Sequence, residues 1–147
     1  MSIVIKPASD VHSAACAKIL SDWIDETQWM PRLHTREEDL GFISHLIHTG
    51  QVMVALMPEC TGFLAMHESD ISCLYVAPEA RDQGIGQSLL NKAKTLSPDY
   101  LTLWIFQANS DARRFYEVND FSAVEQTDGD NDERLPDVRL EWRGHDG

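Results

Sequence analysis

The chain has 147 residues, of which 43% are hydrophobic and 24% are charged, a balance typical of one folded domain with its own core. Its formal net charge of -12 at pH 7 argues against general affinity for nucleic acid or anionic lipid, because both require clustered lysine and arginine side chains. The sequence has neither an apolar run of roughly 20 residues, as a membrane span needs, nor a secretory signal at its start. We therefore expect a cytoplasmic protein whose single domain occupies residues 1–147, with a core from residue 3 to residue 143 or so.

The predicted elements alternate between helices and strands. A short strand at residues 3–6 precedes a helix that Ser9 and Asp10 are suited to cap and that extends toward residue 23. Thr35 to Glu38 form a capping box for a second helix, which ends near Gly50. The remaining elements are three strands, a helix, a strand, a helix and two closing strands, at residues 51–57, 60–68, 71–76, 85–96, 101–106, 110–118, 121–125 and 138–142.

Two of these segments have an unusual composition. The strand at residues 101–106 is almost continuously apolar, which predicts that both of its faces are buried. The loop at residues 125–137 carries six acidic residues against one arginine, Arg134. Such a loop is typical of a solvated, mobile hairpin, although it would also attract a cationic substrate.

The cysteines and histidines give little support for metal or redox chemistry. Cys16, Cys60 and Cys73 are odd in number and widely spaced, which favours reduced thiols over a disulfide framework or a zinc ribbon. His45 and His48 lie three residues apart on a predicted helix, but no third ligand accompanies them. We therefore expect no metal site.

A glycine-containing loop, Arg-Asp-Gln-Gly-Ile-Gly at residues 81–86, joins a predicted strand to a predicted helix. Gly84 and Gly86 allow the backbone to approach a ligand closely, and the N–H groups at the start of the helix attract an anion. Arg81 adds a positive charge, so a pyrophosphate is the natural occupant. A Walker loop is excluded because its lysine motif does not occur, and a Rossmann fingerprint is excluded because Leu89 stands where a third glycine is required. A tight turn needed only for connectivity remains the alternative.

A second motif follows the strand at residues 101–106. Asn109 and Tyr116 are seven residues apart, or two helical turns, so their side chains can face the same side. Ala112, between them, keeps that face low enough for a ligand to lie along it. The two motifs together indicate a site that binds an extended, phosphate-bearing ligand.

The two motifs resemble those of the GNAT superfamily of N-acetyltransferases. The family's glycine signature is Gln/Arg-x-x-Gly-x-Gly/Ala, and its later helix carries Asn-x-x-Ala-x-x-Phe-Tyr. The residues that match are Arg81, Gly84, Gly86, Asn109, Ala112, Phe115 and Tyr116. Residues 74–78, Leu-Tyr-Val-Ala-Pro, look like the family's fourth strand and its proline-marked exit. The resemblance covers nearly the whole chain.

This resemblance implies an α/β (α+β) fold: a mixed, mostly antiparallel sheet of about 6–7 strands, splayed between strands four and five and flanked by about four helices. It also implies that acetyl-CoA is the co-substrate. Backbone groups of strand four would pair with the pantetheine arm, loop amides would hold the pyrophosphate, and the later helix would contact the pantetheine amides and the thioester sulfur. The residues in these roles would be Leu74, Tyr75 and Val76, then Arg81, Asp82, Gln83, Gly84, Ile85 and Gly86, and finally Asn109 and Tyr116.

The sequence departs from the family pattern at one position. A glycine usually precedes the phenylalanine after the later helix, whereas here Asn119 and Asp120 precede Phe121. Because Asn and Asp tolerate left-handed backbone better than other non-glycine residues, we expect the turn to persist with some strain.

Acetyl transfer to an amine requires a deprotonated nucleophile, a polarised thioester carbonyl and a proton for the leaving thiolate. Tyr116 is the candidate acid. Glu68 is the candidate base, with His67 and Asp70 as neighbours that spacing does not separate from it. Cys73 could act as a nucleophile, but its position in a strand favours a small buried side chain.

The sequence thus predicts an enzyme that moves an acetyl group from acetyl-CoA to a primary amine by direct attack in a ternary complex. The alternative is a catalytically silent acyl-CoA-binding or regulatory module on the same fold. The acceptor would be a small-molecule or peptide amine, and the negative net charge suits a cationic one. Residues 29–34, Trp-Met-Pro-Arg-Leu-His, would line the acceptor pocket, contact a partner subunit or cover the sheet edge. No nucleic-acid or membrane partner is expected, and the chain would be a monomer or a homodimer.

Overall fold

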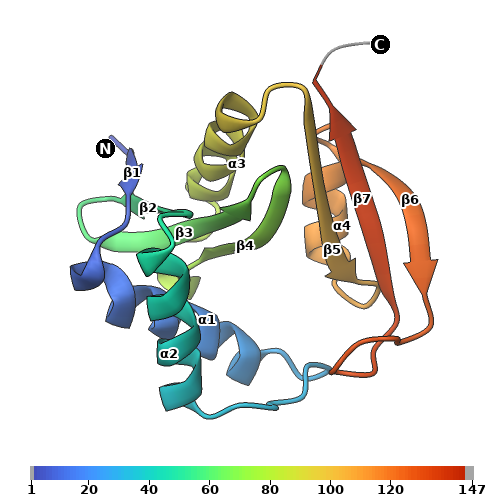
Figure 1. Ribbon diagram of the computed structural model, residues 1–147, viewed down its shortest axis with the longest axis horizontal. Coiled ribbons are helices and arrows are strands. Elements are labelled where there is room, and N and C mark those ends of the chain that lie inside the picture. Colours follow the sequence, from blue (N-terminus) through green and yellow to red (C-terminus); the bar gives the residue numbers. More distant parts are fainter. Residues whose placement is uncertain (1, 145–147) are drawn as a thin grey trace.

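The computed structural model describes residues 2–144. Within this part of the chain, a seven-stranded sheet with the order β1-β2-β3-β4-β5-β7-β6 is accompanied by four α-helices (Figure 1). The strands are β1 (Val4–Pro7), β2 (Val52–Leu56), β3 (Cys60–His67), β4 (Asp70–Val76), β5 (Tyr100–Phe106), β6 (Ser122–Thr127) and β7 (Asp137–Arg143). The helices are α1 (Ser13–Glu26), α2 (Arg36–His48), α3 (Ile85–Leu96) and α4 (Ser110–Glu117). The expected mixed, mostly antiparallel sheet with flanking helices is confirmed.

The sheet opens between β4 and β5, as the sequence predicted. These strands run parallel and, in the described residues, share a single register position, Asp70 opposite Thr102. There the N–H of Thr102 donates to the carbonyl of Ser69 at 3.0 Å. Beyond this point the strands diverge, and Figure 1 shows β5, β7 and β6 standing apart from β1–β4. The backbone of β4 therefore faces a gap along the rest of its length.

Helices cover both faces of the β1–β4 half of the sheet. Gly62 of β3 faces α3, because a Cβ at this position would lie 3.2 Å from the side chain of Leu89. The next residue, Phe63, points to the opposite face, since side chains alternate along a strand. There its ring lies 5.9 Å from that of Tyr75, which in turn lies 5.2 Å from Trp23 of α1. The start of α3 and the end of α1 therefore approach the gap from opposite sides of the sheet.

Most predicted boundaries agree with the structure to within a few residues. The capping box of α2 is confirmed: the N–H of Glu38 donates to Thr35 Oγ1 at 3.1 Å, and the N–H of Thr35 donates to Glu38 Oε1 at 2.9 Å. The first helix differs, because residues 10–12 form a separate 3-10 turn and α1 continues to Glu26. This extension places the end of α1 beside the gap.

The prediction that β5 is buried on both faces is wrong. Leu101 and Leu103 are buried, whereas Trp104 is 42% exposed. The two leucines face the core, where Leu103 also lines the cavity, while Trp104 points to the other face of β5. A continuous apolar run therefore combines core residues with residues that line a cavity.

The turn after α4 takes the expected left-handed form at Asp120, whose φ is 73°. Its neighbour Asn119 is buried and joins α4 to α3, accepting from Gln87 Nε2 at 2.8 Å and donating to the carbonyl of Phe115 at 2.8 Å.

None of the helices within residues 2–144 combines the length and apolar character needed to cross a bilayer.

Candidate active site

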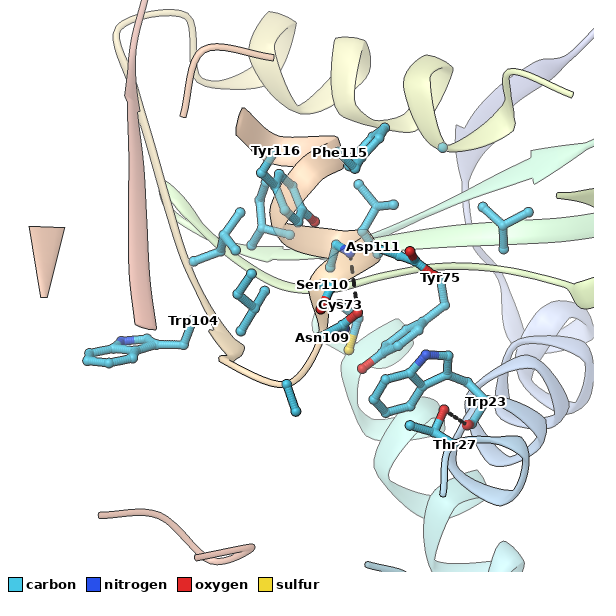
Figure 2. Close-up of a pocket in the computed structure, with 18 of the residues that line it drawn as sticks. Trp23, Thr27, Cys73, Tyr75, Trp104, Asn109, Ser110, Asp111, Phe115 and Tyr116 are labelled. Carbon is cyan, nitrogen blue, oxygen red and sulfur yellow. Dashed lines mark hydrogen bonds between the residues drawn. The ribbon is translucent and has the colours of Figure 1, made fainter. Parts of the chain in front are cut away.

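A cavity of about 770 Å³ occupies the gap between the two halves of the sheet. Its walls come from β4, the middle of β5, the first two turns of α4, the start of α3 and the end of α1 with the connection that follows it (Figure 2). Its size is typical of a site for a small molecule or cofactor. The splay therefore creates a binding cavity that both faces of the sheet help to line.

The start of α3 supplies backbone donors to this cavity. Gly84 is the N-cap residue with φ of 83°, and within the described chain it gives the helix no side-chain cap. The first N–H groups of α3 therefore point out of the helix without helical partners. Gly86 lines the cavity, where a Cβ would lie 3.8 Å from both Phe115 and Val76. Together with Arg81, which also lines the cavity, this arrangement suits an anion.

The other residues of the glycine loop lie outside the cavity wall. The side chains of Asp82 and Gln83 are exposed, whereas Ile85 is buried in the core with 1% exposure. Asp82 adopts a left-handed conformation with φ of 63°, which helps to turn the chain into α3. The assignment of Asp82, Gln83 and Ile85 as ligand-binding residues stays a prediction.

The start of α4 brings the predicted pair of side chains into the same cavity. Asn109 caps the helix, because its Oδ1 accepts from the N–H of Ala112 at 3.2 Å. Within residues 2–144 the Nδ2 of Asn109 makes no hydrogen bond, so it can donate to a ligand. Asn109, Ala112 and Tyr116 all line the cavity, as their spacing on one helical face predicted. Figure 2 shows this face of α4 opposite β4.

Tyr116 is held rigidly. Its residue is 6% exposed, and its ring contacts Phe115 and Phe121 edge-on at centroid distances of 5.1 and 5.2 Å. Burial, and to a smaller extent the nearby Cys73 thiol, raises the pKa of Tyr116 above the ordinary tyrosine value of about 10. The hydroxyl therefore stays protonated at neutral pH and can donate a hydrogen bond into the cavity.

An aromatic wall closes the α1 side of the cavity. Trp23, at the last turn but one of α1, contacts Tyr75 of β4 and Trp29 of the α1–α2 connection, with centroid distances of 5.2 and 5.9 Å. Trp29 reaches Phe106 at the end of β5, at 5.7 Å. This chain of rings, Trp23, Trp29, Tyr75 and Phe106, connects α1 to both diverging strands.

Known proteins share both the sequence and this architecture. Residues 37–123 match the family described as acetyltransferase (GNAT) domain. The chain is 31% identical over 123 residues to the peptidyl-lysine N-acetyltransferase YjaB of Salmonella typhimurium, a match that covers 84% of this chain and 70% of that protein. The chain belongs to the GNAT acetyltransferases.

Further comparisons agree with this assignment. The chain is 46% identical over 52 residues, or 35% of its length, to the Mycobacterium tuberculosis protein named probable N-acetyltransferase Rv2775, and this match spans 30% of that protein. The solution structure of apo YjaB from Escherichia coli has a TM-score of 0.81 at 21% identity, covering 99% of this chain and 100% of that one. The structure of yncA from Salmonella typhimurium with its cofactor acetyl-CoA has a TM-score of 0.75 at 17% identity, covering 100% and 96%. These two structures show that the GNAT chain shares their fold.

In this GNAT chain, Cys73 is poorly suited to nucleophilic catalysis. It lines the cavity but is 6% exposed. Burial, with a smaller contribution from Asp70, raises the pKa of Cys73 to about 12. The nucleophilic thiolate is therefore scarce at neutral pH.

The structure does not bring Glu68 to the cavity of the GNAT chain. Glu68 lies in the exposed turn between β3 and β4, with φ of 53°, close to the end of the splay where the two sheet halves meet. His67, also exposed, lies 3.4 Å from Gln51 through its Nδ1, and neither His67 nor Asp70 lines the cavity. The proposed role of Glu68 as the base stays a prediction without geometric support.

The connection that carries Trp29 is held by ion pairs, one of which reaches a buried carboxylate. Arg32 Nε lies 2.6 Å from Asp25 Oδ1, and Arg32 Nη1 lies 3.0 Å from Asp39 Oδ2, whose residue is 6% exposed. Arg32 Nη2 also donates to the carbonyl of Ser21 at 3.0 Å. Because these contacts join α1, the connection and α2, they fix the path that brings Trp29 to the cavity of the GNAT chain.

Sequence reasoning missed several residues of the α1 side of the cavity. Trp23, Glu26 and Thr27 all line it. From the sequence, Trp23 is only one of the apolar residues on the buried face of its helix, a role that any amphipathic helix would explain. Glu26 carries no local signal, because its partner Arg81 is 55 residues away in the sequence.

Proposed function

We propose that this acetyltransferase moves the acetyl group of acetyl-CoA to the primary amine of a lysine side chain, by direct attack while both substrates are bound. The observation that carries the proposal is the single cavity lined by the uncapped start of α3, the gap-facing edge of β4 and the Asn109–Tyr116 face of α4. An acyl-CoA donor would need such groups: N–H donors for its pyrophosphate, a strand edge for its pantetheine arm and a hydroxyl near its sulfur.

The donor would lie along the gap. Backbone groups of β4 that face the gap, in the segment Leu74, Tyr75 and Val76, would bind the pantetheine arm as an added strand binds a sheet edge. The N–H groups at the start of α3, assisted by Arg81, would hold the pyrophosphate. The Nδ2 of Asn109 would donate to a pantetheine carbonyl, since the Oδ1 of the same side chain already accepts from Ala112.

The chemistry would use backbone donors and one side chain. N–H groups near Val76 would polarise the thioester carbonyl as charge develops on its oxygen. The protonated Tyr116 hydroxyl would donate a hydrogen bond to the leaving sulfur, whose thiol has an ordinary pKa of about 8.5. The proton released when the amine becomes an amide balances the proton that the thiolate gains. The acceptor enters as an amine, because a lysine ammonium, with a pKa of about 10.4, must first lose a proton.

Three observations support lysine as the acceptor class. The relative YjaB of Salmonella typhimurium is named for peptidyl-lysine acetylation. The aromatic wall of Trp23 and Trp29 offers ring faces to an alkyl stem and its cationic end. The net charge of -12 would also attract a cationic protein segment.

An amine panel tests the proposal. Thiol release from acetyl-CoA would be measured with a blocked lysine peptide, a peptide with a free N-terminus, a polyamine and an amino sugar, alongside a reaction without acceptor. We expect amide formation, and release above the no-acceptor rate, with the lysine peptide. Binding of acetyl-CoA without turnover of the lysine peptide would reject the proposed acceptor, and failure to bind acetyl-CoA would reject the whole proposal.

A further inference from the structure

An ion pair joins two sides of the cavity that would serve different substrates. Arg81 Nη2 lies 2.5 Å from Glu26 Oε1, and both residues line the cavity. Glu26 is the last residue of α1, on the side of the aromatic wall, whereas Arg81 lies in the loop that leads into α3. Both side chains are more than one third exposed, so the pair is accessible to a ligand.

A donor pyrophosphate would compete with Glu26 for Arg81. A guanidinium binds phosphate oxygens through the same paired donors that bind a carboxylate, and the pyrophosphate carries more charge. The N–H groups at the start of α3 would add to the binding of the pyrophosphate. Glu26, by contrast, has Arg81 as its one ion-pair partner within residues 2–144. Donor binding would thus leave the Glu26 carboxylate unpaired at the cavity wall.

The position of Glu26 suits an incoming ammonium group. Trp23 lies three residues earlier on α1 and therefore on the same helical face. Both line the cavity beside Trp29, so a cation there would meet one carboxylate next to the indole rings of Trp23 and Trp29. The other acidic side chain lining the described cavity is Asp111, in the first turn of α4, where the helix dipole already offsets its charge.

We propose that Glu26 is the carboxylate that binds the acceptor ammonium, and that acetyl-CoA makes it available by taking Arg81 away from it. This inference rests on the proposed function. It assigns Glu26 a positioning role toward the acceptor, and it predicts that the acceptor binds the donor-loaded enzyme more tightly than the free enzyme.

The first test measures the acetyl-CoA dissociation constant of the full chain. Glu26→Gln removes the competing carboxylate, so the variant is expected to bind acetyl-CoA about 1.4-fold to 5-fold more tightly, the range of an exposed ion pair. Glu37→Gln, an exposed residue of α2 away from the cavity, controls for the change in net charge. In an Arg81→Gln background the gain is expected to vanish. Affinity no tighter than that of the Glu37→Gln variant would overturn the competition.

The second test measures binding of a blocked lysine peptide with and without saturating CoA. In the wild type, CoA is expected to tighten peptide binding, and in Glu26→Gln this tightening is expected to be lost. In steady-state kinetics, Glu26→Gln should raise the KM for the peptide about 10-fold or more, with a smaller change in kcat. A purely structural role would leave the CoA-dependent tightening in place, and that result would overturn the inference. A wild type that binds no acetyl-CoA would instead reject the proposed function itself.

Discussion

The ring of Trp29 meets that of Phe106 edge-on, with centroids 5.7 Å apart and an interplanar angle of 71°. The contact links the α1–α2 connection to the end of β5, in the half of the sheet that diverges from β4. The contact therefore bounds the gap at the end opposite the one register position that β4 and β5 share. The width of the cavity on this side depends on how the connection is held, and Arg32 holds it.

Replacing Trp29 with alanine should impair acceptor binding selectively. The change removes a ring that would contact the acceptor, and a cation–π contact of about 0.5–2 kcal/mol corresponds to a rise of about 2-fold to 30-fold in the KM for a lysine peptide. Steady-state kinetics would measure this, and the acetyl-CoA dissociation constant should stay unchanged. Phe42→Ala, which removes a half-exposed ring of α2 outside the cavity, should affect neither constant. An equal loss of donor affinity would contradict the assignment of Trp29 to the acceptor side.

Two substitutions at Gly86 should separate helix stability from ligand access. A Cβ there would make ordinary contacts at 3.8 Å, so Gly86→Ala should retain acetyl-CoA binding and raise the thermal midpoint, since alanine favours a helix over glycine by about 1 kcal/mol. Gly86→Leu extends into the cavity and should weaken acetyl-CoA binding about 10-fold or more. Calorimetry on both variants tests this pair. Similar acetyl-CoA affinities for the alanine and leucine variants would show that the ligand does not approach this position.

Tyr116→Phe should reduce kcat strongly while leaving the fold and the donor affinity intact. The phenylalanine ring keeps the contacts with Phe115 and Phe121, and only the hydroxyl is lost. Loss of a catalytic proton donor lowers a rate by about 100-fold or more. Tyr100→Phe serves as the matched control, because the Tyr100 hydroxyl contacts Glu141 and Arg139 outside the cavity. Turnover that survives in Tyr116→Phe would remove Tyr116 from the catalytic mechanism.

Cys73→Ala should retain acetyl transfer and change how stability depends on pH. The pKa of the buried thiol is about 12 in the folded chain and about 8.5 in the unfolded chain, so the unfolded chain releases this proton first as pH rises. The stabilisation linked to this proton is complete below about pH 8.5 and is lost as pH approaches about 12. Urea unfolding at pH 8 and near pH 10.5 should therefore show a smaller alkaline loss in Cys73→Ala than in the wild type. Equal alkaline losses of stability in the two proteins would show that the Cys73 thiol does not contribute to the pH dependence. Loss of acetyl transfer in Cys73→Ala would instead support a covalent role for this thiol.

Asp120 offers a test of backbone strain away from the cavity. Its left-handed φ of 73° costs a non-glycine residue free energy that glycine avoids. Asp120→Gly should raise the free energy of unfolding by up to about 1 kcal/mol, whereas Asp120→Ala should lower it, although both remove the same charge. Thermal unfolding of the two variants would measure the difference. Equal midpoints would mean that the turn relaxes without cost.

Some features of this protein could be predicted because their cause is local. The capping box at Thr35 and Glu38 depends on residues three positions apart, and the shared face of Asn109 and Tyr116 follows from the helical period alone. The left-handed turn at Asp120 follows from which side chains tolerate that conformation. The glycine loop and the Asn109–Tyr116 face also carried the family resemblance, which gave the mixed sheet and its splay.

Other features depend on where distant segments meet. The strand at residues 101–106 looked buried on both faces, but whether Trp104 meets core or cavity depends on how far β5 diverges from β4, which no residue of β5 specifies. In the sequence, Glu68 is one of several acidic residues near β4 that could act as the base. In the structure, its turn lies at the end of the splay where β4 and β5 meet, away from the cavity.

The sequence by itself determined the two motifs proposed to bind the donor, because a glycine loop and one face of a helix are built from residues close together in the chain. Only the tertiary structure decided which residues line the side of the cavity proposed for the acceptor. There Trp23, Glu26 and Trp29 from the first helix and its connection meet Tyr75, Arg81 and Phe106 from the centre of the chain. Such contacts form when the two halves of the sheet diverge and α1 packs against the gap, and the packing of the whole core sets that geometry.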